Sequence, residues 1–134
     1  MAVNFSTQVR NAMLDSIETT IGASPKLRFY TGAKPANTAA AATGTLLAEI
    51  TCPADFYANA ASGSKSLSGS WTAAASGDGS AGYYRMYDSA GSVCHEQGTI
   101  TATGGGGDMT LDNISIATGQ TITITSKTLN AGNS

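Results

Sequence analysis

The one histidine of the chain, His95, lies between a thiol and a carboxylate, Cys94 and Glu96. A cysteine–histidine pair can act as a nucleophile and its general base, provided that the two side chains converge. The surrounding run contains several β-branched residues and predicts a strand, in which neighbouring side chains point to opposite faces. Cys94 and Glu96 therefore point away from His95, and we interpret His95 as a half-exposed strand residue without a catalytic role.

Other reactive residues lack the spacing that catalysis or metal binding requires. No Gly-x-Ser-x-Gly elbow singles out a serine, and the nine acidic residues are scattered, mostly beside turns. The glycine run 104–107 lacks the following helix and lysine of a phosphate-binding loop. Cys52 and Cys94 lack metal-ligand spacing; they could form a disulfide, but two free thiols fit a cytoplasmic product better. We expect no catalytic residues, no cofactor and no metal.

The chain of 134 residues suits one domain, 1–134, and carries few charges. Charged residues make up 12%, about half of the roughly 25% usual in soluble domains, and the formal net charge is −2. Because basic residues form no cluster, we expect no direct contact with nucleic acid. No apolar run of about 18 residues predicts a membrane helix, and no secretory signal is visible, so we expect synthesis in a cytoplasm. A neutral, hydroxyl-rich surface favours a subunit of an assembly.

Residues 6–21 are predicted to form a helix, which Ser6 can cap and Gly22 can end. Leu14 lies off its apolar face, and exposure of Leu14 would mark a contact with a partner. We expect the apolar face to pack on its own domain, with docking on a neighbouring subunit as the alternative. The residues that recur at the spacing of this face are Val9, Ala12, Met13, Ser16, Ile17, Thr20 and Ile21.

The rest of the chain, residues 26–129, is predicted to fold as an antiparallel β-sandwich of the jelly-roll or immunoglobulin-like type. Short runs rich in aromatic and β-branched residues alternate with turn chemistry, which predicts seven or eight strands without intervening helices. Ile122 and Ile124 show the cleanest alternation, and Trp71 is expected in the core. Three of the expected strands are 66–73, 109–116 and 120–129.

Two long loops supply further candidate contacts. Residues 32–44 form a loop of thirteen residues, mostly Ala, Thr, Pro and Asn, and a loop this long in a compact domain is often functional. Residues 54–64 show no regular pattern and predict a second loop. We expect both loops to contact partner subunits, and the candidate contact residues in them are Lys34, Pro35, Asn37, Phe56 and Tyr57.

Several segments of the chain resemble small virion proteins of tailed bacteriophages and prophages, and the similarity extends along nearly the whole chain. Their shared motifs are turns and strand starts rather than catalytic signatures. The resemblance implies a β-sandwich accessory subunit and supplies no active-site residues. The segments are Asn11–Asp15, Thr43–Ala48, Tyr84–Gly91, Asp108–Asn113 and Gly119–Gln120.

The function that this resemblance implies is structural. We expect a capsid decoration or cement protein of the virion, which binds the major capsid protein or other virion subunits and forms a homo-oligomer. A head–tail connector or tail component is one alternative. A receptor- or carbohydrate-binding tail module is another, with Trp71 or the tyrosines of residues 83–87 as its platform. An enzyme would need a pocket in which acids or a nucleophile converge.

Overall fold

The computed structural model describes residues 3–124 and 127–131 and shows a mainly β chain with one helix, as the sequence predicts. Its elements are α1 (Thr7–Ile21), β1 (Lys26–Thr31), β2 (Leu46–Thr51), β3 (Ser64–Ser66), β4 (Trp71–Ala74), β5 (Gly79–Tyr87), β6 (Cys94–Ala102), β7 (Met109–Leu111), β8 (Ser115–Ile116), β9 (Thr121–Ile124) and β10 (Thr128–Asn130).

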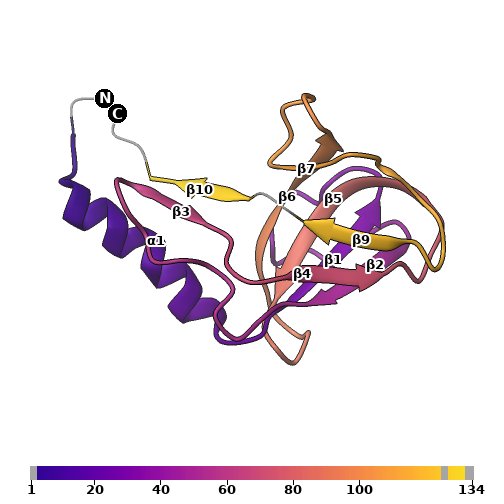
Figure 1. Cartoon of the computed structure of the whole chain (residues 1–134), viewed down its shortest axis with the longest axis horizontal. Coiled ribbons are helices and arrows are strands. Elements are labelled where there is room, and N and C mark those ends of the chain that lie inside the picture. The colour runs from indigo at the N-terminus through magenta and orange to yellow at the C-terminus, as the bar shows by residue number, and fades with distance from the viewer. Residues whose placement is uncertain (1–2, 125–126, 132–134) are drawn as a thin grey trace.

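The strands form one main sheet and two ribbons (Figure 1). The main sheet has the order β2–β1–β5–β6–β7, and β8 pairs with the start of β5. The two ribbons, β4–β9 and β3–β10, are each antiparallel. The β4–β9 ribbon lies across one face of the main sheet, whereas the β3–β10 ribbon extends away from the sheet beside α1.

The core lies between the main sheet and the β4–β9 ribbon, where the sequence places Trp71. This side chain is fully buried, and its indole N–H donates to the carbonyl oxygen of Ser68 at 3.1 Å. Its ring centroid lies 5.6 Å from that of Tyr57, a spacing at which aromatic rings attract each other. Ile122 and Ile124 are buried on the inner face of β9, as their alternation predicts.

β7 contradicts the expected all-antiparallel pairing, because it runs parallel to β6 with Met109 opposite Ile100. A parallel neighbour usually requires a connection of a dozen or more residues. Here the chain returns within residues 103–108, since Gly104 and Gly106 adopt φ values of +89° and +81° that other residues rarely adopt. The glycine run therefore carries the chain back along β6, so that β7 can run parallel to it.

Three predicted strands are each divided in two, so the described residues form ten strands instead of seven or eight. Segment 66–73 divides near Gly69, whose φ of +75° interrupts the extended chain between β3 and β4. Segment 109–116 divides where the Asn113 side chain accepts a hydrogen bond from the Ser115 N–H at 2.9 Å. Segment 120–129 supplies β9 and β10, and its residues 125–126 lie outside the described part of the chain.

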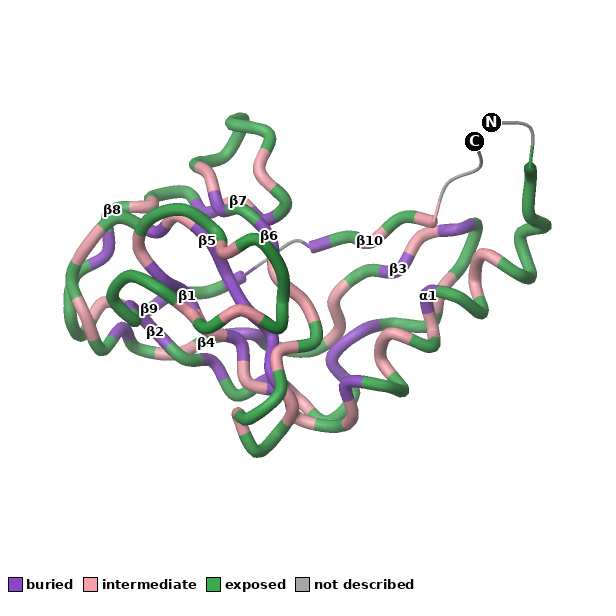
Figure 2. The backbone as a smooth tube through the Cα atoms, turned by 180° about the vertical axis from the view of Figure 1, so that it is seen from behind, coloured by how far each residue is buried: buried purple, intermediate pink, exposed green. Residues whose placement is uncertain are grey.

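Helix α1 and the β3–β10 ribbon form a lobe at one end of the molecule (Figures 1 and 2). The predicted caps of α1 are confirmed. The Ser6 hydroxyl accepts a hydrogen bond from the Val9 N–H at 3.2 Å, and Gly22, at a φ of +86°, donates to the Glu18 carbonyl at 3.0 Å. The sequence thus sets the length of α1 locally, independently of its packing.

Gly82 of β5 allows a close approach of the backbone at Gly32, the residue directly after β1. A Cβ atom at this position would lie 2.0 Å from the carbonyl oxygen of Gly32. We expect Gly82→Ala to lower the free energy of unfolding by about 2–4 kcal/mol, because the backbone itself must move. Urea denaturation measures this loss.

The matched control is Gly119→Ala, where an added Cβ meets nothing within 4 Å but φ is +87°. This backbone strain alone costs roughly 1–2 kcal/mol. A loss at Gly82 no larger than the loss at Gly119 would contradict the close approach.

Candidate docking surface on helix α1

The inner side of α1 carries a polar row beside its buried apolar residues, and this row pairs with a segment outside the named strands. Acceptor side chains at positions 11, 15 and 18 lie along residues 57–63, whose backbone N–H groups point toward the helix. The hydrogen bonds run from Tyr57 N–H to Glu18 at 3.0 Å, from Ala60 N–H to Asp15 at 2.9 Å, and from Gly63 N–H to Asn11 at 2.9 Å. Because buried N–H groups must be paired, these contacts fix which side of α1 faces inward.

Lys65 of β3 reinforces this polar contact from within the lobe. Its side chain is fully buried, and its ammonium group lies 2.7 Å from an Asp15 oxygen and 3.1 Å from a Glu18 oxygen. It also donates to the carbonyl oxygen of Ala58 at 3.0 Å. A buried ammonium group is tolerated when it is paired and hydrogen-bonded in this way.

A second buried lysine, Lys127, joins the lobe to the main sheet. Its ammonium group lies 2.8 Å from an oxygen of Glu96 on β6, and the same carboxylate accepts from the Tyr84 hydroxyl at 2.7 Å and the Tyr57 hydroxyl at 3.3 Å. Both lysine ammonium groups, those of Lys65 and Lys127, lie within 6.0 Å of the Tyr57 ring. One aromatic ring therefore links the two ionic contacts.

The outer face of α1 carries the predicted apolar face, which reverses the orientation that we expected. Val9 and Met13 are 43% and 49% exposed, and only the margin of the predicted face, Ile17 and Ile21, packs on the core. The physical reason is the polar contact described above, which requires the opposite side of α1. We call the exposed residues the α1 stripe; they are Val9, Ala12, Met13, Ser16 and Thr20.

The α1 stripe contains no charged residue. The charged residues of the helix all lie on its other sides, where Arg10 donates to the Ala131 carbonyl and Asp15 and Glu18 bind Lys65. An exposed apolar stripe bordered by polar residues is typical of a surface that contacts another macromolecule.

Three predicted contact residues are buried within the chain, which removes them from its surface. Leu14 is 3% exposed, and Phe56 and Tyr57 are fully buried. Leu14 faces inward because α1 is reversed relative to the prediction. Phe56 and Tyr57 pack their rings 5.0 Å apart beside Trp71, so the 54–64 loop supplies core residues.

The 32–44 loop lies against the face of the main sheet opposite the β4–β9 ribbon, and side chains of β5 and β6 hold it there. Lys34 and Asn37 remain exposed on this loop, and Pro35 is half-buried. The loop is therefore a fixed cover whose outer side chains are available to a partner. The bonds that hold it run from Arg85 to the carbonyls of Asn37 (3.0 Å) and Ala40 (2.7 Å), from Gln97 to the Pro35 carbonyl (2.8 Å), and from the Thr43 N–H to the Tyr83 hydroxyl (2.9 Å).

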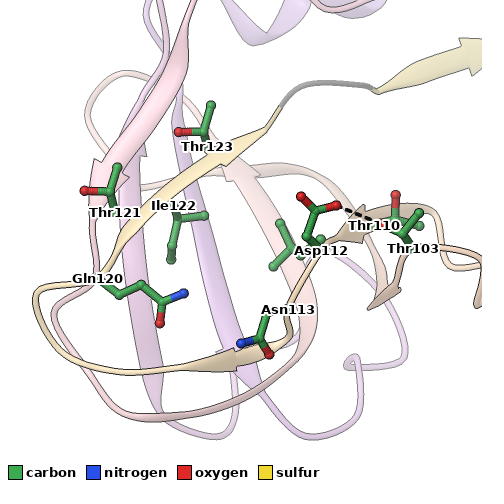
Figure 3. Close-up of a pocket in the computed structure, with 9 residues that line it drawn as sticks. Thr103, Thr110, Asp112, Asn113, Gln120, Thr121, Ile122 and Thr123 are labelled. Atoms are coloured by element: carbon green, nitrogen blue, oxygen red, sulfur yellow. Dashed lines mark hydrogen bonds between the residues drawn. The ribbon is translucent and has the colours of Figure 1, made fainter.

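A groove of about 570 Å³ lies between β7 and β9 (Figure 3). Within the described residues β7 pairs only with β6, and β9 only with β4, so each strand turns one edge to the groove. Its lining is mostly hydroxyl and amide groups, and Asp112 is its one charged residue, hydrogen-bonded by the Thr103 hydroxyl at 3.2 Å. This lining can form hydrogen bonds but contains no histidine, cysteine, lysine or aromatic residue.

A second cavity of about 480 Å³ brings His95 near two carboxylates, those of Glu96 and Asp108. Both carboxylates are engaged elsewhere: Glu96 binds Lys127, and Asp108 accepts from the Thr99 N–H and hydroxyl at 2.9 and 3.1 Å. Neither is hydrogen-bonded to His95 in the described part of the chain. Both carboxylates are therefore already used in contacts within the fold.

The buried hydroxyl and thiol groups near these sites are held in their protonated forms. Burial and the nearby Glu96 carboxylate raise the pKa of Tyr57 and Tyr84, so both phenols act as donors to that carboxylate. Burial raises the pKa of Cys52 to about 12 and also raises the pKa of Cys94. Both cysteines are free thiols, as the sequence favours, although Cys94 is only half-buried.

The described residues contain no group of three or more His, Cys, Asp or Glu that could hold a metal ion. None of their helices combines the length and apolar character needed to cross a membrane. No protein-family profile matches the chain, and neither a curated protein nor a solved structure shows significant similarity to it.

Lys127→Met tests the ionic contact between the lobe and the main sheet. The substitution leaves the Glu96 carboxylate without its cation, and breaking a buried ion pair in this way typically costs about 3–5 kcal/mol. We expect a loss toward the lower end, because the two tyrosine hydroxyls remain. Lys26→Met is the control, since Lys26 hydrogen-bonds Thr51 at the surface; equal losses in urea denaturation would contradict a special role for Lys127.

Asp15 should make stability depend on pH in the acid range. Hydrogen bonds from Lys65 and from the Ala60 N–H hold the pKa of Asp15 below its usual value. A carboxyl group with a lowered folded-state pKa stabilises the fold above its unfolded-state pKa of about 3.9, and this contribution disappears as the pH falls through the folded-state pKa.

We therefore expect Asp15→Asn to be less stable than the parent at pH 6 and to lose less stability between pH 5 and pH 2. Urea unfolding at a series of pH values measures both curves. Curves that stay parallel over this range would show that the Asp15 carboxylate contributes nothing.

Proposed function

We propose that this chain is a non-enzymatic structural protein of a tailed-phage virion, and specifically a capsid decoration or cement protein that binds the major capsid protein. The observation that carries the proposal is the α1 stripe. A helix that turns its charged residues inward and an uncharged apolar stripe outward is suited to contact another subunit.

The rest of the molecule supports a role in contact rather than turnover. Its buried charged side chains, Lys65, Arg85 and Lys127, are engaged in ion pairs or hydrogen bonds. Its 32–44 loop presents Lys34 and Asn37 on a rigid support. Within this proposal the β part is a sandwich of the jelly-roll or immunoglobulin-like type, in which the β4–β9 ribbon is the second layer. The resemblance to small virion proteins points in the same direction.

The carbohydrate-binding alternative loses its platform. Trp71 and the tyrosines of residues 83–87 are all less than a tenth exposed, so none offers a face on which a sugar could stack. The groove between β7 and β9 has no aromatic lining residue either. A head–tail connector or tail component uses the same kind of contact surface, and the number of copies in the virion distinguishes it from a decoration protein.

Quantitative mass spectrometry of purified virions tests the proposed function. Cyclic rings at the neck or tail hold few subunits, whereas a capsid lattice holds many, so we expect a copy number on the order of hundreds. About a dozen copies or fewer would place the protein at the neck or tail and exclude decoration. Absence from virions would contradict the structural role altogether.

A further inference from the structure

We propose that the α1 stripe contacts the α1 stripe of a second copy of this chain, as an antiparallel helix pair related by a two-fold axis. The inference rests on the proposed function in taking α1 as a contact surface within the assembly. It goes further by assigning that surface to a second copy, so that the exposed side chains of the 32–44 loop, Lys34 and Asn37, are left for the major capsid protein.

The first step is the position of the stripe on the molecule. With 3.6 residues per turn, Val9, Met13 and Ser16 lie on the side of α1 nearly opposite Leu14 and Glu18, which face the lobe. Figures 1 and 2 show α1 at one end of the molecule, with the β3–β10 ribbon and the main sheet both on its other side. A second molecule can therefore approach the stripe without meeting another element of this one.

The second step is charge. A charged partner surface would lose hydration on the stripe and gain no opposite charge there, because Asp15 and Glu18 are already bound to Lys65. The matching surface must itself be uncharged and apolar. The same stripe on a second copy meets this requirement.

The third step is the size of the side chains along the stripe. Its N-terminal half carries the large residues Val9 and Met13, and its C-terminal half carries Ser16 and Thr20. The Ser16 hydroxyl donates to the Met13 carbonyl at 2.6 Å, so it needs no hydrogen-bond partner across an interface. In an antiparallel pair the large residues of each helix face the small residues of the other helix. A parallel pair would place small residues against small ones and leave a gap beside Ser16 and Thr20.

The expected strength follows from the length of the helix. Fifteen residues span about 22 Å, and two such helices bury less than the roughly 1,200 Å² at the low end of stable interfaces. The pair should therefore be weak between free molecules and become effective where copies are held side by side, since a high local concentration replaces intrinsic affinity.

Disulfide trapping tests the antiparallel pair. We would introduce Val9→Cys together with Ser16→Cys, and Val9→Cys together with Thr20→Cys, into a Cys94→Ser background; Cys52 is buried and stays reduced. Positions 9 and 16 lie about 10 Å apart along one helix, and positions 9 and 20 lie farther apart still. Disulfides need Cα atoms within about 7 Å, so a bond within one chain is excluded.

We expect at least one of these double variants to form a covalent dimer on mild oxidation of concentrated protein. Val9→Cys alone should form little, because in an antiparallel pair the two copies of position 9 lie far apart. The matched control is Gln8→Cys with Thr19→Cys, an exposed pair with a similar spacing but beside the stripe. Circular dichroism of each variant confirms that it is folded.

Two results would overturn the inference. Efficient cross-linking of Val9→Cys alone would indicate parallel helices, and double variants that cross-link no better than the control would indicate that the stripe does not pair with itself. As a second readout, Met13→Lys should abolish concentration-dependent dimerisation in sedimentation velocity, whereas Gln8→Lys should leave it unchanged.

These experiments use purified protein, so their outcome is separate from that of the virion measurement. A chain whose double variants cross-link no better than the control in concentrated solution, yet which is abundant in virions, would contradict the helix pair and leave the proposed function standing. A chain that dimerises through α1 but is absent from virions would do the reverse.

Discussion

The structure depends on the hydrogen-bonding requirement of a short segment, residues 57–63, that β3 pairs only in part. Residues 57–63 cross the lobe as irregular chain, and a buried N–H without an acceptor costs about as much as a lost hydrogen bond. Asn11, Asp15 and Glu18 supply those acceptors from one side of α1. Because these acceptors must face residues 57–63, the apolar stripe on the opposite side of the helix faces outward.

The two buried lysines extend this requirement to the rest of the molecule. Lys65 of β3 forms an ion pair with Asp15 of α1. Lys127, which directly precedes β10, forms an ion pair with Glu96 of the main sheet. Since each ammonium group also lies near the Tyr57 ring, movement of the lobe would expose an aromatic side chain and separate buried charges together. The lobe is thus an integral part of the fold, and the direction in which α1 faces is fixed with it.

Sequence reasoning predicts the features that local chemistry determines. The caps of α1, the inward isoleucines of β9 and the buried Trp71 all follow from neighbouring residues. It fails for the orientation of α1, because periodicity identifies an apolar face but not what covers it. Asn11, Asp15 and Glu18 recur at helical spacing, which could have indicated a polar inner side. Their partners, however, are backbone N–H groups, and the residue types of the partner segment do not reveal them. The parallel pairing of β7 with β6 could not be predicted either, since a glycine run permits many backbone paths.

The arrangement of buried charge and exposed apolar side chains supports the proposal that this protein associates through α1. Soluble chains usually keep ionic groups at the surface and apolar side chains inside, whereas this one buries Lys65, Arg85 and Lys127 and exposes Val9 and Met13. Burying exposed apolar area contributes about 25 cal/mol per Å², so a second apolar surface over α1 recovers free energy that folding alone leaves unused. The edges of β7 and β9 differ in this respect, because they are short and carry threonine hydroxyls that water can satisfy. The apolar stripe, in contrast, would be more stable in contact with another apolar protein surface than in contact with water.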